Sequence, residues 1–200
     1  MPSIEIDGTS TMVMHISQLA RLLHLPVPAM PEASRLAYDL LLVVGFWTSL
    51  IRPLPFELLV ADTESRGRSI RNLTMNAVYP ISLLPDAYET GKFDWGLVDM
   101  DEKLARQYED TRSLVEFAQS VHDGWGLFVA AYENDLAKHD PWIDAPRGRM
   151  RFSELLGHQR WHLSFHYRQI GEFLASRGRP VPDGLRLDAA VAIALPPSVF

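Results

Sequence analysis

The segment 155–169 reads Leu-Leu-Gly-His-Gln-Arg-Trp-His-Leu-Ser-Phe-His-Tyr-Arg-Gln. Its histidines, His158, His162 and His166, stand four residues apart. On a helix this spacing places them on one face, each about 40° round from the last. Two imidazoles at i and i+4 can bind one metal ion because their ring nitrogens converge. The segment therefore predicts a helix that carries a candidate metal site.

The sequence predicts four main amphipathic helices, at about 31–52, 69–90, 111–138 and 153–176. The first is apolar nearly all round from Leu40 to Trp47, which predicts deep burial. Ser69 is the expected N-cap of the second, and Pro80 and Pro85 must bend or break it. Gly178 is the expected C′ residue of the last. Four such helices with moderate loops predict a four-helix bundle, a fold that can build metal sites in its core.

The segments between these helices are predicted to be loops and one short helix. Residues 60–68 and the proline-containing stretch 141–148 are expected as loops. Asp99, with Glu102 three residues later, predicts a short helix that ends near Tyr108.

The N-terminal residues differ from the rest of the chain. Ser3–Gly8 and Thr11–Met14 are expected to pair as a β-hairpin that turns at Asp-Gly, and Ile16–Leu23 as a short helix. We therefore divide the chain into a hairpin-and-helix appendage with its linker, the bundle, and a tail that lies on the surface of the bundle or of a partner. Their bounds are 1–28, 31–178 and 179–200.

Composition excludes several classes of protein. The chain has 200 residues, of which 47% are apolar, and a net charge of −6, so nothing in it suggests nucleic-acid binding. It has no cysteine, which excludes disulfides, thiol catalysis and zinc–thiolate sites and fits a cytoplasmic protein. The longest apolar run, Leu40–Trp47, is too short for a bilayer, and the N-terminus does not read as a signal peptide. We expect no association with membranes.

The histidine helix resembles the last helix of the DinB/YfiT-like superfamily, in which H-x-x-x-H is followed by R-G-Q-[IL]. Upstream, 68–76 is similar to the second-helix pattern R-S-[LV]-R-[DE]-L-x-x-H of that superfamily, and 111–117 is similar to the start of its third helix. The order and spacing of the three segments agree. The resemblance covers about 31–178 and implies an all-α, DinB-like four-helix bundle that is often a homodimer, with the N-terminal hairpin and helix as an appendage.

The N-terminal appendage is faintly similar to the end of a glutaredoxin-like domain. The similarity lies in Ile4–Gly8, the strand that follows and Leu19–Leu23. The Cys-x-x-Cys of such domains is absent, so this similarity implies no thiol chemistry. We favour a hairpin and helix that pack on the bundle or are exchanged in a dimer.

The DinB-like resemblance also implies a site. The usual one holds a divalent ion, commonly nickel or zinc, with one histidine from the second helix and two from the last. The last-helix pair corresponds to His162 and His166, and the second-helix ligand corresponds to Asn76. Asparagine departs from the pattern, because its carbonyl oxygen suits harder cations. His158 lies about 12 Å along the helix axis from His166, so it does not easily replace the missing ligand; its neighbour Glu154 offers it a partner other than a metal.

Three states of the site remain open. A divalent metal binds weakly through His162, His166 and water, with or without Asn76. Alternatively the site is metal-free and Asn76 is hydrogen-bonded to one of the two histidines, a state that we favour slightly. In the third state a carboxylate on a neighbouring helix, Glu116 or Asp39, completes the ligand set.

Two functions are compatible with these states. We favour a non-catalytic bundle that binds a small molecule or a partner in the degenerate site. The resemblance to the DinB/YfiT-like superfamily implies the alternative, a metal-dependent thiol transferase, isomerase or hydrolase-like enzyme that uses His162 and His166 as ligands. Aromatic residues are placed to line a pocket but more often form a core; they are Trp47, Tyr79, Trp125, Trp161 and Phe165. Ser164 belongs to no nucleophilic triad, because residues two apart on a helix point to different faces.

Overall fold

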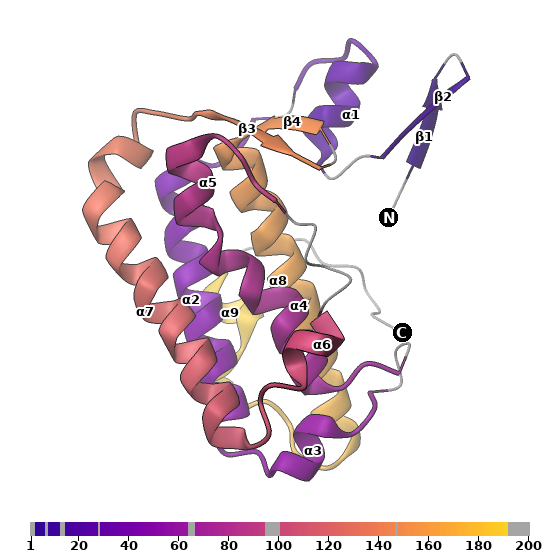
Figure 1. Ribbon diagram of the computed structural model, residues 1–200, viewed down its shortest axis with the longest axis vertical. Helices are drawn as coiled ribbons and strands as arrows, with labels where there is room; N and C mark the ends of the chain where they lie inside the picture. The colour runs from indigo at the N-terminus through magenta and orange to yellow at the C-terminus, as the bar shows by residue number, and fades with distance from the viewer. Residues whose placement is uncertain are drawn as a thin grey trace.

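The computed structural model describes residues 3–6, 8–12, 15–27, 29–63, 67–94, 101–146 and 148–191. These residues form a mostly helical structure with two small antiparallel hairpins (Figure 1). Its main helices are α2 (Ala33–Ile51), α4 (Ile70–Ser82), α7 (Thr111–Leu136) and α8 (Phe152–Ser176). Helices α2 and α4 each pack against both α7 and α8, so the four enclose one core. The prediction of a mostly helical fold is confirmed.

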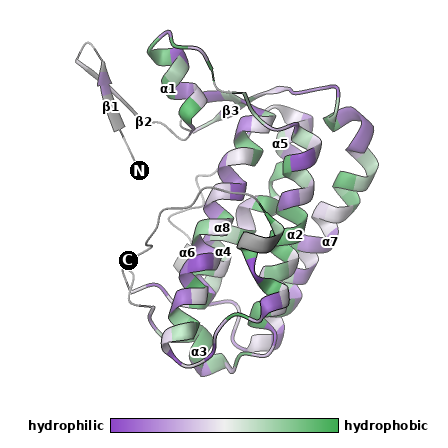
Figure 2. Cartoon of the chain, turned by 180° about the vertical axis from the view of Figure 1, so that it is seen from behind, coloured by the Kyte–Doolittle hydropathy of each residue, from purple (hydrophilic) through white to green (hydrophobic). Residues whose placement is uncertain are grey.

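Helix α2 is the central element of that core. It is coloured mostly hydrophobic in Figure 2, and Leu40, Val43, Val44 and Trp47 are fully buried along it. The indole N–H of Trp47 donates to Thr74 Oγ1 on α4 at 3.0 Å. Of the described helices α2 alone has the length and apolar content of a membrane span, and its burial against α7 and α8 is typical of a core helix.

The second predicted helix is broken in two. Ser69 accepts a hydrogen bond from the Asn72 amide as the N-cap of α4, as predicted. After Pro80 the helix ends, and α5 (Leu84–Thr90) begins beyond Leu83 with Pro85 in its first turn. A proline fits the first turn of a helix because it lacks the N–H that would be unpaired there.

Short elements depart from the predictions. A helix that was not expected, α3 (Phe56–Val60), follows α2, and Thr63 N then donates to Arg68 O within the expected loop. Helix α6 (Asp101–Ala105) is shorter than predicted, and Asp99 lies outside the described residues. The prediction of a loop at 141–148 is wrong, because β3 (Trp142–Ala145) and β4 (Gly148–Arg151) form an antiparallel hairpin there.

The appendage contains the predicted elements. Strands β1 (Ser3–Ile6) and β2 (Thr9–Met12) pair with Ile6 opposite Thr9, so the second strand begins two residues earlier than expected. Helix α1 (Ile16–Leu22) follows and lies beside the β3–β4 hairpin at one end of the bundle (Figure 1).

Helix α8 ends at the opposite end of the bundle from α1, and the C-terminal segment follows it (Figure 1). Gly178 adopts a φ of 72°, and Arg179 N donates to Leu174 O at 2.9 Å, which is the predicted glycine termination. The chain then returns along the bundle through a 3₁₀ turn (Asp183–Leu185) and α9 (Leu187–Ala190). Tyr167 Oη donates to Leu185 O at 2.9 Å, which ties this segment to α8.

Candidate functional site

The three histidines lie in one row on α8, as predicted. The ring centroids of His158 and His162 are 6.0 Å apart with the rings nearly parallel, and those of His162 and His166 are 4.7 Å apart with the rings nearly perpendicular. His158 and His166 are buried, and His162 is half-buried. His158 is therefore a stacked outer neighbour, and His162 and His166 form an inner pair whose rings meet nearly at right angles.

The inner pair presents two ring nitrogens to each other. His162 Nε2 and His166 Nε2 are 3.2 Å apart, which is the distance of an N–H···N hydrogen bond. Two nitrogens bound to one zinc ion at about 2.0–2.1 Å with a near-tetrahedral angle are also separated by about 3.3 Å. The separation of these two atoms is thus compatible with both the metal-free and the metal-bound state.

Gln169 determines which nitrogen of His166 carries the proton. Its amide oxygen Oε1 lies 2.9 Å from His166 Nδ1. An amide oxygen only accepts, so Nδ1 carries the proton and Nε2 keeps its lone pair. In the hydrogen-bonded pair His162 Nε2 is therefore the donor. Metal-binding histidines are commonly oriented in this way through their second nitrogen.

His166 stays neutral over the physiological range of pH. Burial lowers the pKa of this imidazole to about 4; the hydrogen bond to Gln169 opposes the shift and the positive charge of Arg68 adds to it. A neutral imidazole is the form that accepts a hydrogen bond or a metal ion, so His166 itself need not lose a proton before it binds one. The nearby arginine charge, however, disfavours a cation at the site.

Gln159 was not identified from the sequence. It is fully buried on α8, and neither its amide oxygen nor its amide nitrogen meets a hydrogen-bond partner among the described residues. An unmet buried polar group costs about 1–3 kcal/mol. Gln159 lies three residues before His162 and seven before His166, on the same side of the helix. A single glutamine in an amphipathic pattern gives no signal that distinguishes it from a surface residue.

Asn76 is buried on α4, a helix that packs against α8. The residue thus belongs to the interior of the bundle, as the second-helix ligand would. Its direct contact with the histidine pair stays a prediction.

The two carboxylates proposed to complete the site are held elsewhere. Asp39 accepts from Arg160 of α8 at 2.6 Å and from Arg35 at 3.0 Å. The Glu116 side chain is 71% exposed and lies 4.0 Å from Arg112. The described part of the chain contains no group of three histidine, aspartate or glutamate side chains placed to hold a metal. Among the described residues, therefore, neither Asp39 nor Glu116 is placed to complete the ligand set.

Glu154 binds the N-terminal appendage, and its expected contact with His158 stays a prediction. Both of its carboxylate oxygens accept from Arg21 of α1, at 2.7 and 2.6 Å, and one also accepts from the Arg151 amide. Burial raises the pKa of this carboxyl, but the hydrogen bonds from Arg21 and Arg151 outweigh it and leave the pKa below its usual range. Glu154 is therefore the anchor of the appendage.

The aromatic residues divide between core and site. Trp47 and Trp125 are buried core residues, and the Trp125 N–H donates to Ala37 O at 3.0 Å. Trp161 stacks on Phe165 with 5.2 Å between ring centroids, and Phe165 meets the His166 ring edge-on at 5.4 Å. Phe165 thus lies between the Trp161 ring and the His166 ring.

Comparisons with protein-family models, with curated proteins and with solved structures gave no significant match to this chain. The geometry of the histidine pair is therefore the starting point for its function. Two imidazoles with facing nitrogens, one of them oriented by Gln169, can share a hydrogen bond or bind one soft or borderline cation.

Proposed function

We propose that the protein is a non-catalytic, DinB-like helical bundle that binds one divalent transition metal weakly through His162 and His166. The observation that carries the proposal is the 3.2 Å separation of the two Nε2 atoms, together with the hydrogen bond that orients His166. The order of the four main helices along the chain agrees with the resemblance found in the sequence.

The chemistry of the donors favours a borderline metal such as nickel or zinc. Imidazole nitrogen suits these ions, and the pair lies on one helix, so the two donors keep their separation without help from a loop. Gln169 supplies the outer hydrogen bond that ligating histidines usually make. The remaining positions would go to water and to Asn76, if its amide oxygen reaches the ion.

The affinity should be modest for two reasons. Only two protein nitrogens are assigned, whereas tight zinc sites have three or four protein ligands. The positive charge of Arg68 acts on His166 and would also repel a cation. We therefore expect a metal that exchanges with solution rather than one retained through purification.

Calorimetric titration of the untagged, metal-free chain with Ni²⁺ and with Zn²⁺ tests the proposal. One ion per chain should bind, and His162→Ala and His166→Ala should each abolish the saturable binding. His24→Asn is the matched control, because His24 is exposed in the appendage and its positive φ of 54° suits asparagine. If wild type and both alanine variants bind alike, the ion is elsewhere and the proposal fails. If nothing binds the wild type, the proposal is also overturned and the hydrogen-bonded, metal-free pair is the native state.

A further inference from the structure

A groove of about 560 Å³ lies on α2 and is lined also by α7 and by the returning C-terminal segment. This volume is in the range of pockets that hold small organic ligands, about 300–1,000 Å³. Helix α2 supplies most of the lining, α7 supplies Gln119 and His122, and the returning segment supplies Leu185. His162 and His166 do not line the groove, so an inference about it does not rest on the proposed metal site.

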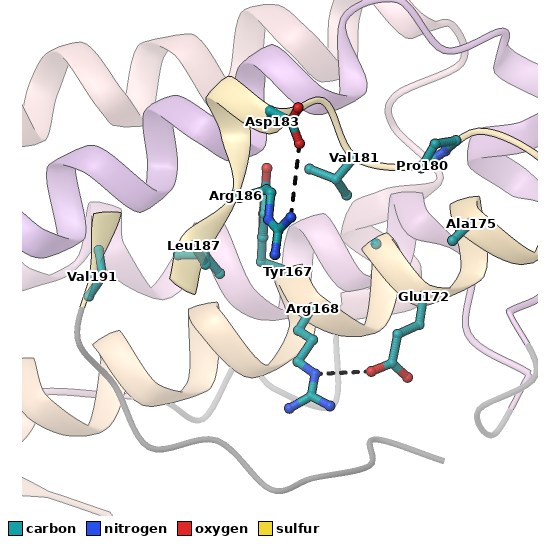
Figure 3. Close-up of a pocket in the computed structure, with 11 residues that line it drawn as sticks. Tyr167, Arg168, Glu172, Ala175, Pro180, Val181, Asp183, Arg186, Leu187 and Val191 are labelled. Atoms are coloured by element: carbon teal, nitrogen blue, oxygen red, sulfur yellow. Dashed lines mark hydrogen bonds and ion pairs between the residues drawn. The ribbon is translucent and has the colours of Figure 1, made fainter. Parts of the chain in front are cut away.

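The described residues that line this groove include no arginine, lysine, aspartate or glutamate. The same returning segment also lines a cavity against α8, and Figure 3 shows two ion pairs there, Arg168–Glu172 and Arg186–Asp183. In the groove the lining is mainly aliphatic and aromatic, with Tyr38, Leu41, Leu42, Phe46 and Leu185. Burial of a charge without a partner is costly. A neutral, largely apolar molecule is therefore the kind of ligand that this lining fits.

One ring nitrogen of His122 is held by a carboxylate. His122 Nδ1 lies 3.1 Å from Asp123 Oδ1, and Gln119 Nε2 donates to the same oxygen at 2.9 Å. These two hydrogen bonds hold the pKa of the Asp123 carboxyl below its usual range. An ionised carboxylate only accepts, so the neutral imidazole carries its proton on Nδ1 and keeps a lone pair on Nε2. Within the described part of the chain, the hydrogen bonds of this ring involve Nδ1, and Nε2 is left as an acceptor.

Gly45 of α2 lies against this nitrogen. A Cβ at position 45 would be 3.3 Å from His122 Nε2, which places Nε2 at the groove that the glycine also lines. Two other hydroxyl groups of the lining already donate elsewhere, Thr48 Oγ1 to Val44 O and Tyr38 Oη to Glu133. His122 Nε2 is therefore the acceptor that a bound molecule can reach from the groove.

We infer that this groove binds a neutral phenol, whose hydroxyl donates to His122 Nε2 and whose ring packs on the apolar lining. A phenol combines an O–H donor with an aromatic ring and carries no charge near neutral pH, since its pKa is about 10. Aromatic rings pack well on one another when they are offset or edge-on. The half-buried ring of Phe46 can take part in such a contact, and it is supported from behind by Tyr167, at 6.4 Å between ring centroids.

NMR titration of the full chain with p-cresol and with p-xylene tests the inference. p-Cresol should shift the backbone amide signals of Gly45 and His122 in a saturable way, with one site per chain. p-Xylene has nearly the same shape but a methyl group in place of the hydroxyl, so it measures the apolar contribution alone.

His122→Phe removes the acceptor and keeps a ring. The ratio of p-cresol affinity to p-xylene affinity should fall about 3–10-fold in this variant, which is the effect of one neutral hydrogen bond. The ratio cancels the difference in apolar transfer between the two probes. His139→Phe is the matched control, because it makes the same change at an exposed position outside the groove, and it should leave the ratio unchanged. Ser49→Trp fills the groove from an exposed position on α2 and should abolish saturable binding of both probes.

Four results would overturn the inference. p-Cresol leaves the Gly45 and His122 signals of the wild type unchanged or shifts them without saturation; His122→Phe leaves the affinity ratio unchanged; His139→Phe lowers the ratio as much as His122→Phe does; or Ser49→Trp binds p-cresol like the wild type. Circular dichroism checks the fold of each variant. Ser49→Trp keeps the test sound if His122→Phe misfolds, because Ser49 is exposed.

Discussion

Arg21 of the appendage holds both carboxylate oxygens of Glu154 at the first turn of α8. The Glu154 side chain is almost fully buried, and Arg21 is about one-third exposed. Arg21 also lies over the Trp142 ring of β3, at 5.5 Å from its centroid. Arg21 thus attaches the appendage to the bundle through one charged contact and one aromatic one.

Removal of Arg21 should destabilise the protein. In Arg21→Gln the Glu154 carboxylate stays buried without its charge partner, and we expect a loss of about 2 kcal/mol, discounted for the exposure of Arg21. Urea unfolding measures the loss. The double variant with Glu154→Gln should recover most of it, because the buried charge is then gone. If the double variant is no more stable than Arg21→Gln alone, the charge is not the cause.

Low pH should loosen the cap of α1. His15 Nδ1 accepts from the Ser17 amide at 3.2 Å as N-cap of this helix, and only a nitrogen with a free lone pair can accept. Burial lowers the pKa of His15 below its ordinary 6.5, against the opposing charge of Glu154. Between the folded and unfolded pKa values the unfolded chain binds more protons, so this contribution to stability falls as the pH drops below 6.5.

Hydrogen exchange of the Ser17 amide checks this cap. Relative to its intrinsic rate, exchange should speed up as the pH falls from 6.5, and His15→Asn should flatten the change, because asparagine caps a helix without titrating. An equal pH dependence in the variant would assign the effect to another group. Glu154 is one such group, since its contribution, with a lowered pKa, is lost only as acid protonates the carboxyl below its ordinary 4.5.

Local sequence signals allowed the main helices to be predicted, but contacts between residues far apart in the sequence could not be predicted from them. Ser69 marks a helix start through its hydroxyl and Gly178 a helix end through its left-handed backbone, so both could be identified from neighbouring residues alone. The Arg21–Glu154 contact joins residues 133 positions apart and follows from no periodicity.

The β3–β4 hairpin shows the same limit. Its strands have four residues each, and β3 is held partly by the turn after α5, where Phe93 N donates to Asp144 O at 2.9 Å. A four-residue segment beside prolines predicts a loop, but its pairing with β4 makes it a strand, and the turn after α5 adds a distant backbone partner. In the candidate site, the four-residue spacing predicted the row of histidines. The close approach of the His162 and His166 ring nitrogens depends on side-chain rotamers, which a sequence pattern does not specify.

Gln169 should control how tightly His166 binds a metal. Gln169→Leu removes the acceptor of the Nδ1 proton, which should weaken Ni²⁺ binding about 10–100-fold. Gln169→Glu keeps an acceptor and adds a negative charge, so it should strengthen binding and raise the pKa of His166. Metal titration and the NMR titration of the imidazole measure both effects. Unchanged affinity in the leucine variant would place the ion away from His166 Nε2.

Asn76→His tests the placement of the second-helix ligand. A third imidazole from α4 should convert weak binding into binding of one nickel or zinc ion that survives dialysis, because three protein ligands hold these metals tightly. Metal analysis of the dialysed protein measures this directly. Retention of no more metal than the wild type would show that position 76 does not face the pair, and that the resemblance over 68–76 aligns the helix wrongly.

Gln159→Met distinguishes a structural defect from a functional group. The Gln159 amide is fully buried and meets no hydrogen-bond partner among the described residues, so an apolar side chain of similar shape should raise the free energy of unfolding by about 1–2 kcal/mol. The gain should appear in urea unfolding of the metal-free chain. If the amide also holds a metal-bound water beside His162, Ni²⁺ affinity should fall in the same variant, since a stabilising change at a site commonly costs function. A loss of stability would mean that the amide has a partner in solution.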